Sequence, residues 1–124
     1  ITEVLQVPMH LVPGNHDKKP EKLANLMREY ESAQFTLLPK LCEIDVTYPG
    51  GAQRVTMCHF PLLSWAGSGR GTYMCHGHCH GKLAKTHTHR IDVGVDCHSY
   101  APISFAELQR EVARRKRERE AHSG

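Results

Sequence analysis

Met74-Cys75-His76-Gly77-His78-Cys79-His80-Gly81 is the densest group of metal-ligand side chains in this sequence. It combines three histidines with two cysteines, and imidazole and thiolate are preferred ligands of zinc and other borderline transition metals. Side chains of a strand alternate in direction, so in an extended segment His78 and His80 point the same way and form half of a metal site. We interpret His76 as a supporting or structural residue and Cys79 as facing away from the metal.

The composition indicates a soluble globular domain. The chain has 124 residues, of which 40% are hydrophobic and 23% charged, and this is enough to bury one core. No apolar run approaches the ~20 residues that a membrane span needs. The five cysteines cannot all pair with one another, and without a signal peptide we interpret them as thiols of a reducing compartment. We therefore expect a cytoplasmic protein without a membrane segment.

Histidine is in excess. Ten histidines favour metal chemistry before any motif is considered. Two of them, His87 and His89, are interpreted as residues of a solvated loop. Among the cysteines, we interpret Cys58, Cys75 and Cys97 as small buried residues.

The net positive charge is concentrated near the C-terminus. The segment from Glu107 onward has six Arg or Lys against four Glu, which supplies most of the formal net charge of +3. Ser104 followed three residues later by Glu107 is a capping-box pattern and predicts the start of a helix. Three apolar residues form the inner face of that helix: Phe105, Leu108 and Val112. Residues 113–124 are almost all polar or charged, and we expect a solvated, frayed helical tail.

Short apolar runs separated by turn residues predict an α/β (α+β) fold with mixed sheets. Apolar or alternating patterns mark the expected strands, at residues 9–12, 35–38, 41–48, 54–58 and 72–75, and a further apolar run covers residues 91–95. Pro49-Gly50-Gly51 joins two of them in an expected hairpin. Pro20 begins an expected amphipathic helix with the apolar residues Leu23, Leu26, Met27 and Tyr30.

Ligand-type residues follow three of these strands. Asn15-His16-Asp17 comes directly after a strand that Pro13-Gly14 ends, and His59 follows a strand that Pro61 ends. The third group is residues 76–80. Open α/β sheets build their sites at such strand ends, where neighbouring strands bring together residues that are distant in the sequence.

These groups resemble motifs of the calcineurin-like metallophosphoesterases. Gly14-Asn15-His16-Asp17, a lone His59 and Gly77-His78-Cys79-His80 look like the last three motifs of that family, in the same order. The flanking Asp92-Val93-Gly94-Val95-Asp96 agrees, and the resemblance spans about Met9–Val112. It implies a four-layer fold, with two mixed sheets and helices outside, and a two-metal centre at strand ends.

The resemblance also implies a ligand set. Asn15, His59 and His78 would bind the second of two divalent ions (Mn, Zn, Fe or Ni), and His80 would bind the first. Such ions hold a phosphoester substrate and lower the pKa of a bridging water. The family's N-terminal Asp-x-His and Gly-Asp motifs, whose carboxylates join the metals, are absent ahead of Gly14. We therefore expect at best one ion, with zinc the best match, and little or no activity from the chain alone.

Catalytic roles follow from the same resemblance. His16 would be the acid or the electrostatic partner of the substrate phosphate, with Asp17 orienting its imidazole. Arg70, in a glycine-rich loop, is a candidate substrate-phosphate ligand, with a surface arginine as the alternative. We expect Asp96 and His98 to border the pocket.

The missing motifs also predict partners. Residues 1–124 would form a single, incomplete domain whose sheet has an exposed edge. A missing N-terminal segment, a partner chain or a homodimer would cover that edge.

Three other interpretations stay open. The chain could be a pseudoenzyme, which keeps the fold and a metal without catalysis. A structural zinc site could use Cys75, Cys79, His76 and His80. A nucleic-acid module built on the basic helix is the weakest, because that helix has no aromatic platform. Nucleic acid nevertheless stays open as a substrate, beside protein phosphate and nucleotides.

Overall fold

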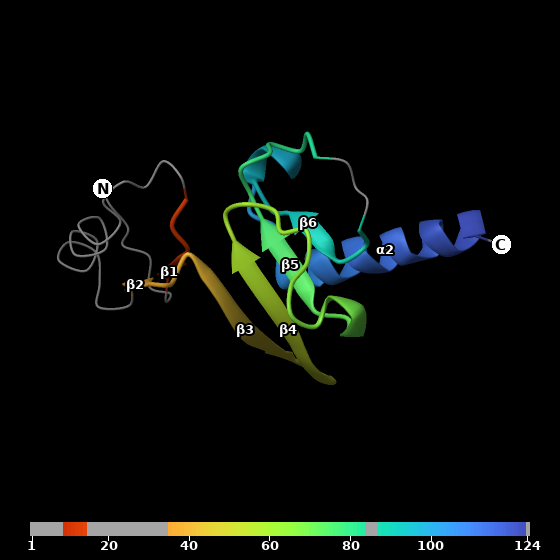
Figure 1. The fold of residues 1–124 in the computed structure, drawn as a ribbon, viewed down its shortest axis with the longest axis horizontal. Coiled ribbons are helices and arrows are strands. Elements are labelled where there is room, and N and C mark those ends of the chain that lie inside the picture. Colours follow the sequence, from red (N-terminus) through yellow and green to blue (C-terminus); the bar gives the residue numbers. More distant parts are fainter. Residues whose placement is uncertain (1–8, 15–34, 84–86, 124) are drawn as a thin grey trace.

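The structure, a computed structural model, describes residues 9–14, 35–83 and 87–123. They form a mixed α+β fold (Figure 1). The strands are β1 (Met9–Leu11), β2 (Phe35–Leu37), β3 (Leu41–Tyr48), β4 (Gly51–Cys58), β5 (Tyr73–His76) and β6 (Arg90–Asp92). The other elements are two 3-10 turns, Ser68–Arg70 and Val95–Cys97, and helix α2 (Phe105–Ser123). The helix expected from Pro20 lies outside the described residues.

The strands form a two-stranded sheet and a four-stranded sheet. β1 and β2 pair in parallel, and the larger sheet has the order β3-β4-β5-β6. The predicted hairpin is confirmed, because β3 and β4 are antiparallel with Tyr48 opposite Gly51. β4, β5 and β6 run parallel, so their carboxyl ends meet at one edge of the sheet. This arrangement places His59, His76 and Asp92 at the same edge.

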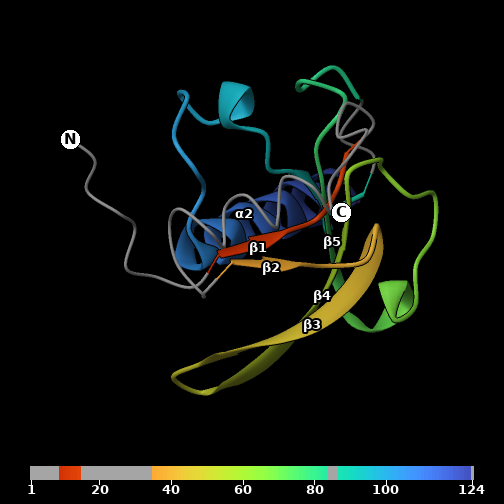
Figure 2. The same ribbon diagram turned by 90° about the vertical axis from the view of Figure 1, so that its left-hand side faces the viewer.

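Helix α2 packs on one face of the larger sheet (Figure 2). One buried cluster joins the helix to β4, β5 and β6, and its members are Val55, Tyr73, Cys75, Ile91, Leu108 and Val112. Phe105 packs against this cluster. The inner face predicted for the helix is therefore confirmed, and the apolar contacts with α2 hold the three parallel strands in place.

The capping box at the start of α2 is also confirmed. Glu107 donates its N–H to Ser104 Oγ at 3.1 Å, and Ser104 donates its N–H to Glu107 Oε1 at 3.4 Å. Each of these groups would otherwise lack a partner within the helix.

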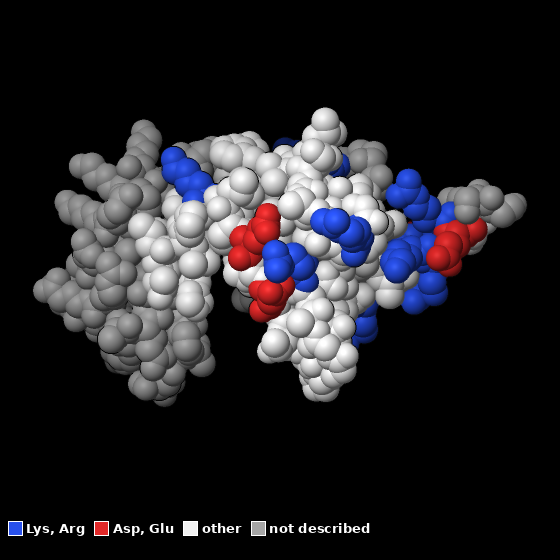
Figure 3. All heavy atoms as spheres, turned by 60° about the horizontal axis from the view of Figure 1, so that its bottom comes forward, with Lys and Arg blue, Asp and Glu red and all other residues white. Residues whose placement is uncertain are grey.

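The predicted tail is helical, because α2 continues to Ser123, and the fraying of its last turns stays a prediction. Arg114 pairs with Glu111 one turn earlier and with Glu118 one turn later, and such pairs stabilise a helix surface. Figure 3 shows positive side chains gathered on this part of the molecule, interspersed with acidic ones. None of the helical segments that the structure describes has both the length and the apolar character that crossing a bilayer demands.

β3 forms one edge of the larger sheet. Within the described ranges, no strand pairs with its outer side. Arg54 on β4 bridges Asp45 at 2.6 Å and Glu43 at 3.1 Å, but these side chains are exposed, and exposed ion pairs contribute little to stability. Leu41 remains 54% exposed. We predicted that a further segment or chain covers an exposed edge of the sheet, and this stays a prediction.

Candidate metal centre

Gly14, His59 and Gly77, one residue from each of the three predicted motifs, lie close together. A Cβ atom on Gly14 would lie only 3.0 Å from His59 Nδ1. Gly77, directly after β5, donates its N–H to the carbonyl oxygen of His59 at 2.9 Å. Glycine at position 14 lets the backbone approach the imidazole closely. The segment after β1 therefore reaches the carboxyl ends of β4 and β5.

His59 and His78 form a close imidazole pair. His59 Nε2 and His78 Nδ1 are 3.2 Å apart, and the rings meet edge to face. Two nitrogens bound to one tetrahedral zinc at ~2.0–2.1 Å are about 3.3 Å from each other. The pair thus has the spacing of two ligands on one ion. Phe60 lies against the His78 ring at a centroid distance of 4.6 Å and forms an apolar wall beside it.

The direction predicted for His78 and His80 is wrong. β5 ends at His76, and the φ angles of His78 and His80 are 66° and 50°, in the left-handed region. His78 faces His59, whereas His80 Nδ1 lies 2.6 Å from Asp96 Oδ2. Side-chain alternation ends with the strand, so the two imidazoles acquire different partners. The pair arises between two neighbouring strands and not along one.

His76 and Cys75 occupy buried positions at the end of β5. His76 is 3% exposed, and its Nδ1 lies 2.9 Å from the carbonyl oxygen of Gly77, in agreement with a structural role. Burial raises the pKa of the Cys75 thiol to about 12, so this thiol stays neutral at pH 7. Cys58 and Cys97 are only partly buried, and the prediction of small buried residues holds for Cys75 alone.

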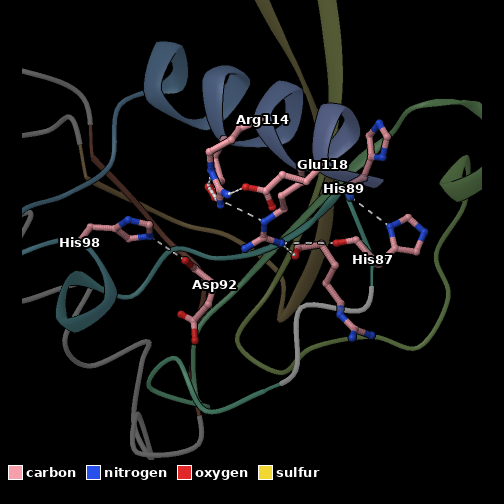
Figure 4. Close-up of polar contacts among 9 residues, drawn as sticks. His87, His89, Asp92, His98, Arg114 and Glu118 are labelled. Carbon is pink, nitrogen blue, oxygen red and sulfur yellow. Dashed lines mark hydrogen bonds and ion pairs between the residues drawn. The ribbon is translucent and has the colours of Figure 1, made fainter. Parts of the chain in front are cut away.

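Asp92 connects the turn after β5 to the end of β6. Its Oδ2 accepts the N–H of Gly81 and its Oδ1 accepts the N–H of Gly94, both at 2.9 Å. Burial opposes ionisation of this carboxyl, but the two N–H donors and the nearby His76 outweigh burial and lower its pKa. His98 Nε2 lies 2.8 Å from the backbone carbonyl of Asp92 (Figure 4). A charged carboxylate therefore holds the turn that carries His78 and His80.

Two cavities lie beside these residues. The larger, of about 440 Å³, is lined in part by His76, His80, Asp92, Asp96, His98 and Arg115. The smaller, of about 210 Å³, is lined in part by Val12, Met57, His59, His76, Gly77 and Val93. Asp96 and His98 border a cavity as expected, and His76 contributes to both. The larger cavity has the size of a small-molecule site.

Not every predicted site residue joins this group. Asn15, His16 and Asp17 lie outside the described residues. Arg70 is exposed at the end of a 3-10 turn that precedes β5, whereas His78 follows β5. The length of the strand therefore separates Arg70 from the imidazole pair.

The alternative structural zinc site is not formed. Across residues 9–14, 35–83 and 87–123, no three His, Cys, Asp or Glu residues are grouped so as to hold a metal ion. All four residues of that alternative belong to these ranges, and His80 turns to Asp96 instead. The described residues thus bring together two nitrogen ligands, His59 and His78.

Comparison with protein-family models, with curated proteins and with solved structures finds no match. The metallophosphoesterase resemblance accordingly rests on the three sequence motifs. Sequence reasoning missed the contact between Asp96 and His80. The only sign of this contact in the sequence was the second aspartate of Asp92-Val93-Gly94-Val95-Asp96. That residue, Asp96, is 16 positions from His80.

His87 and His89 are half-buried, so their interpretation as solvated loop residues is wrong. The His87 ring lies 4.7 Å from the ring of Trp65, and the His89 ring lies 5.7 Å from that of Tyr73. Arg115 of α2 donates a hydrogen bond to the carbonyl oxygen of Arg90 at 2.9 Å, and this bond connects the segment to the helix. Burial, followed by nearby positive side chains, lowers the pKa of both histidines.

These lowered pKa values predict an acid-sensitive fold. In the unfolded chain, His87 and His89 bind protons near the ordinary pKa of about 6.5. In the folded chain, the same two imidazoles bind protons only at lower pH. Stability that is complete above that pH is therefore lost as the pH falls through the lower folded pKa values. Urea denaturation followed by the fluorescence of Trp65, the only tryptophan, measures this loss. We expect a double His87→Gln, His89→Gln variant to lose less stability than the wild type between pH 7.5 and acid pH. An unchanged pH dependence would contradict this assignment, and His10→Gln, at an exposed position, is the control.

Proposed function

We propose that this chain is a metal-dependent phosphoesterase of the calcineurin-like kind. The best support is the 3.2 Å separation of His59 Nε2 and His78 Nδ1, which suits two ligands of one ion. The close approach of Gly14 to the His59 ring brings the first motif to the same place. The four-layer arrangement of that family is part of the proposal, and the mixed α+β elements are compatible with it.

Asn15, His59 and His78 would hold the ion. Asn15 is bonded to Gly14, whose backbone approaches the His59 ring. An amide oxygen with two imidazole nitrogens is a donor set that suits zinc or manganese. When bound, such an ion polarises a phosphoryl oxygen and makes a bound water more acidic. His59 and His78 offer lone pairs only as neutral imidazoles, so their role is to bind and orient.

Proton transfer is assigned to the first motif. His16 would protonate the departing oxygen of the phosphoester, and Asp17 would orient its imidazole. His80 would serve a first ion, for which the family's carboxylates are absent ahead of Gly14. We therefore propose one ion and low activity, with fuller activity when a partner chain supplies the missing carboxylates. A cytoplasmic location belongs to the same proposal, and the five free thiols suit a reducing compartment.

A non-catalytic metal-binding protein is the second candidate. It is favoured by one observation: the described residues bring together two imidazoles without an anionic ligand beside them. Two divalent ions held close together need anionic ligands to offset their repulsion. A single ion in a neutral site can be held without any hydrolysis.

Metal content and hydrolysis, measured on the same preparation, test the proposal. We expect about one zinc or manganese ion per chain by mass spectrometry, since a site of this kind holds its ion once its ligands are deprotonated. Weak hydrolysis of p-nitrophenyl phosphate should accompany the ion and should disappear with a chelator. An ion without chelator-sensitive hydrolysis would favour the non-catalytic candidate, and a chain that binds no ion would refute both.

A further inference from the structure

Asp96 selects one form of the His80 ring. His80 Nδ1 lies 2.6 Å from Asp96 Oδ2. An ionised carboxylate can only accept a hydrogen bond, so the imidazole donates, and Nδ1 carries the proton. The other nitrogen, Nε2, then keeps its lone pair. The His80 side chain is 71% exposed, so a ligand from solution can reach Nε2.

Side chains at the end of β6 and just after it make two hydrogen bonds with the turn after β5. Asp92 Oδ2 accepts the N–H of Gly81 at 2.9 Å, one residue beyond the His80–Asp96 contact. The two carboxylates converge on Gly94, where a Cβ would lie 2.9 Å from Asp96 Oδ1 and 3.1 Å from Asp92 Oδ1. A larger residue there would force at least one of the two carboxylates to shift. The two aspartates of Asp92-Val93-Gly94-Val95-Asp96 thus have different partners. Asp92 accepts hydrogen bonds from backbone N–H groups, and Asp96 contacts the His80 ring.

The backbone of the turn after β5 is strained, so it needs contacts that hold it in place. His78 and His80 both have left-handed φ angles, of 66° and 50°, a conformation that is strained for a residue other than glycine. Strain of this kind persists only when surrounding contacts hold the backbone. The Gly81–Asp92 and His80–Asp96 contacts are the described interactions that do so on this side of the turn.

We propose that Asp96 is a positioning residue for His80, which it holds as the Nδ1–H tautomer with Nε2 free to bind a divalent ion. Metal-binding histidines usually donate their second N–H to a carboxylate or carbonyl, and losing that partner weakens binding 10–100-fold. The metal role rests on the proposed function. The tautomer is a property of this chain alone and is measured without any metal.

Nitrogen-15 NMR of the imidazole rings tests the inference on the full chain. At pH 8, where ordinary histidines are neutral, we expect His80 to be mainly Nδ1–H in the wild type. Asp96→Ala should shift it toward the Nε2–H form, whereas Asp96→Asn should retain Nδ1–H because its amide oxygen still accepts. Asp45→Ala is the matched control, since Asp45 is an exposed aspartate that pairs with Arg54 instead. Backbone spectra show whether each variant is folded.

Zinc titration separates this inference from the proposed function. Because the proposed function places its one ion at Asn15, His59 and His78, we expect zinc to perturb His80 Nε2 only at concentrations above those that fill that site. The concentration needed should rise about 10–100-fold in Asp96→Ala and recover in Asp96→Asn. An unchanged tautomer in a folded Asp96→Ala variant, or an equal zinc response in both proteins, would overturn the positioning role. A wild type in which no imidazole responds to zinc would overturn the proposed function, while the tautomer result would still decide how Asp96 acts.

Discussion

Alanine at His59 or at His78 is expected to weaken zinc binding by about 100-fold or more. Structural zinc sites with four ligands have apparent binding free energies of ~10–16 kcal/mol, so one ligand contributes roughly 3 kcal/mol, or about two powers of ten. The two nitrogens are 3.2 Å apart, and each variant leaves a single imidazole of the pair. Isothermal titration with zinc on the wild type and on each variant measures the change.

Two further variants make this experiment decisive. His10→Ala replaces an exposed histidine on β1 and should leave the affinity unchanged. Asn15→Ala should weaken binding as much as His59→Ala does if the residue after Gly14 supplies the third ligand. Wild-type affinity in both His59→Ala and His78→Ala would mean that the imidazole pair is only a hydrogen bond between two rings.

Replacing Ile91 with alanine is expected to lower the free energy of unfolding by about 2–5 kcal/mol. Ile91 is 1% exposed on β6, in the buried cluster that joins the sheet to Leu108 and Val112 of α2. Alanine removes apolar contacts and leaves a cavity that a packed core fills only in part. Since small domains are stable by ~5–15 kcal/mol, the loss is a large share of the total.

Urea denaturation followed by circular dichroism measures this change. Leu63→Ala is the matched control, because Leu63 is 93% exposed and its truncation should change the unfolding free energy by about 0.5 kcal/mol or less. Equal effects at Ile91 and Leu63 would mean that α2 does not pack on β6 as the structure has it.

Short-range sequence patterns predicted much of the fold. The alternation over residues 41–48 predicted β3 with its bounds, and Pro49-Gly50-Gly51 predicted the hairpin that follows. The Ser104–Glu107 pattern predicted the start of α2 and its buried residues. Each of these features depends on residues within a few positions of one another, where backbone geometry decides the outcome.

The same local logic failed where the regular structure ended. Strand alternation extended past His76 aligned His78 with His80, but the chain turns there into left-handed conformations. A pattern predicts direction only as far as the hydrogen-bonded element that produces it.

By itself, the sequence determined the kinds of groups available: imidazoles, carboxylates and glycines at strand ends, in an order that resembles a metallophosphoesterase. Only the tertiary structure decided which of them meet. The parallel arrangement of β4, β5 and β6 places His59 against His78, and the packing of the turn after β5 on the end of β6 places His80 against Asp96. Both contacts join residues 16 or more positions apart, and sequence spacing does not encode a distance that depends on how strands pair in space.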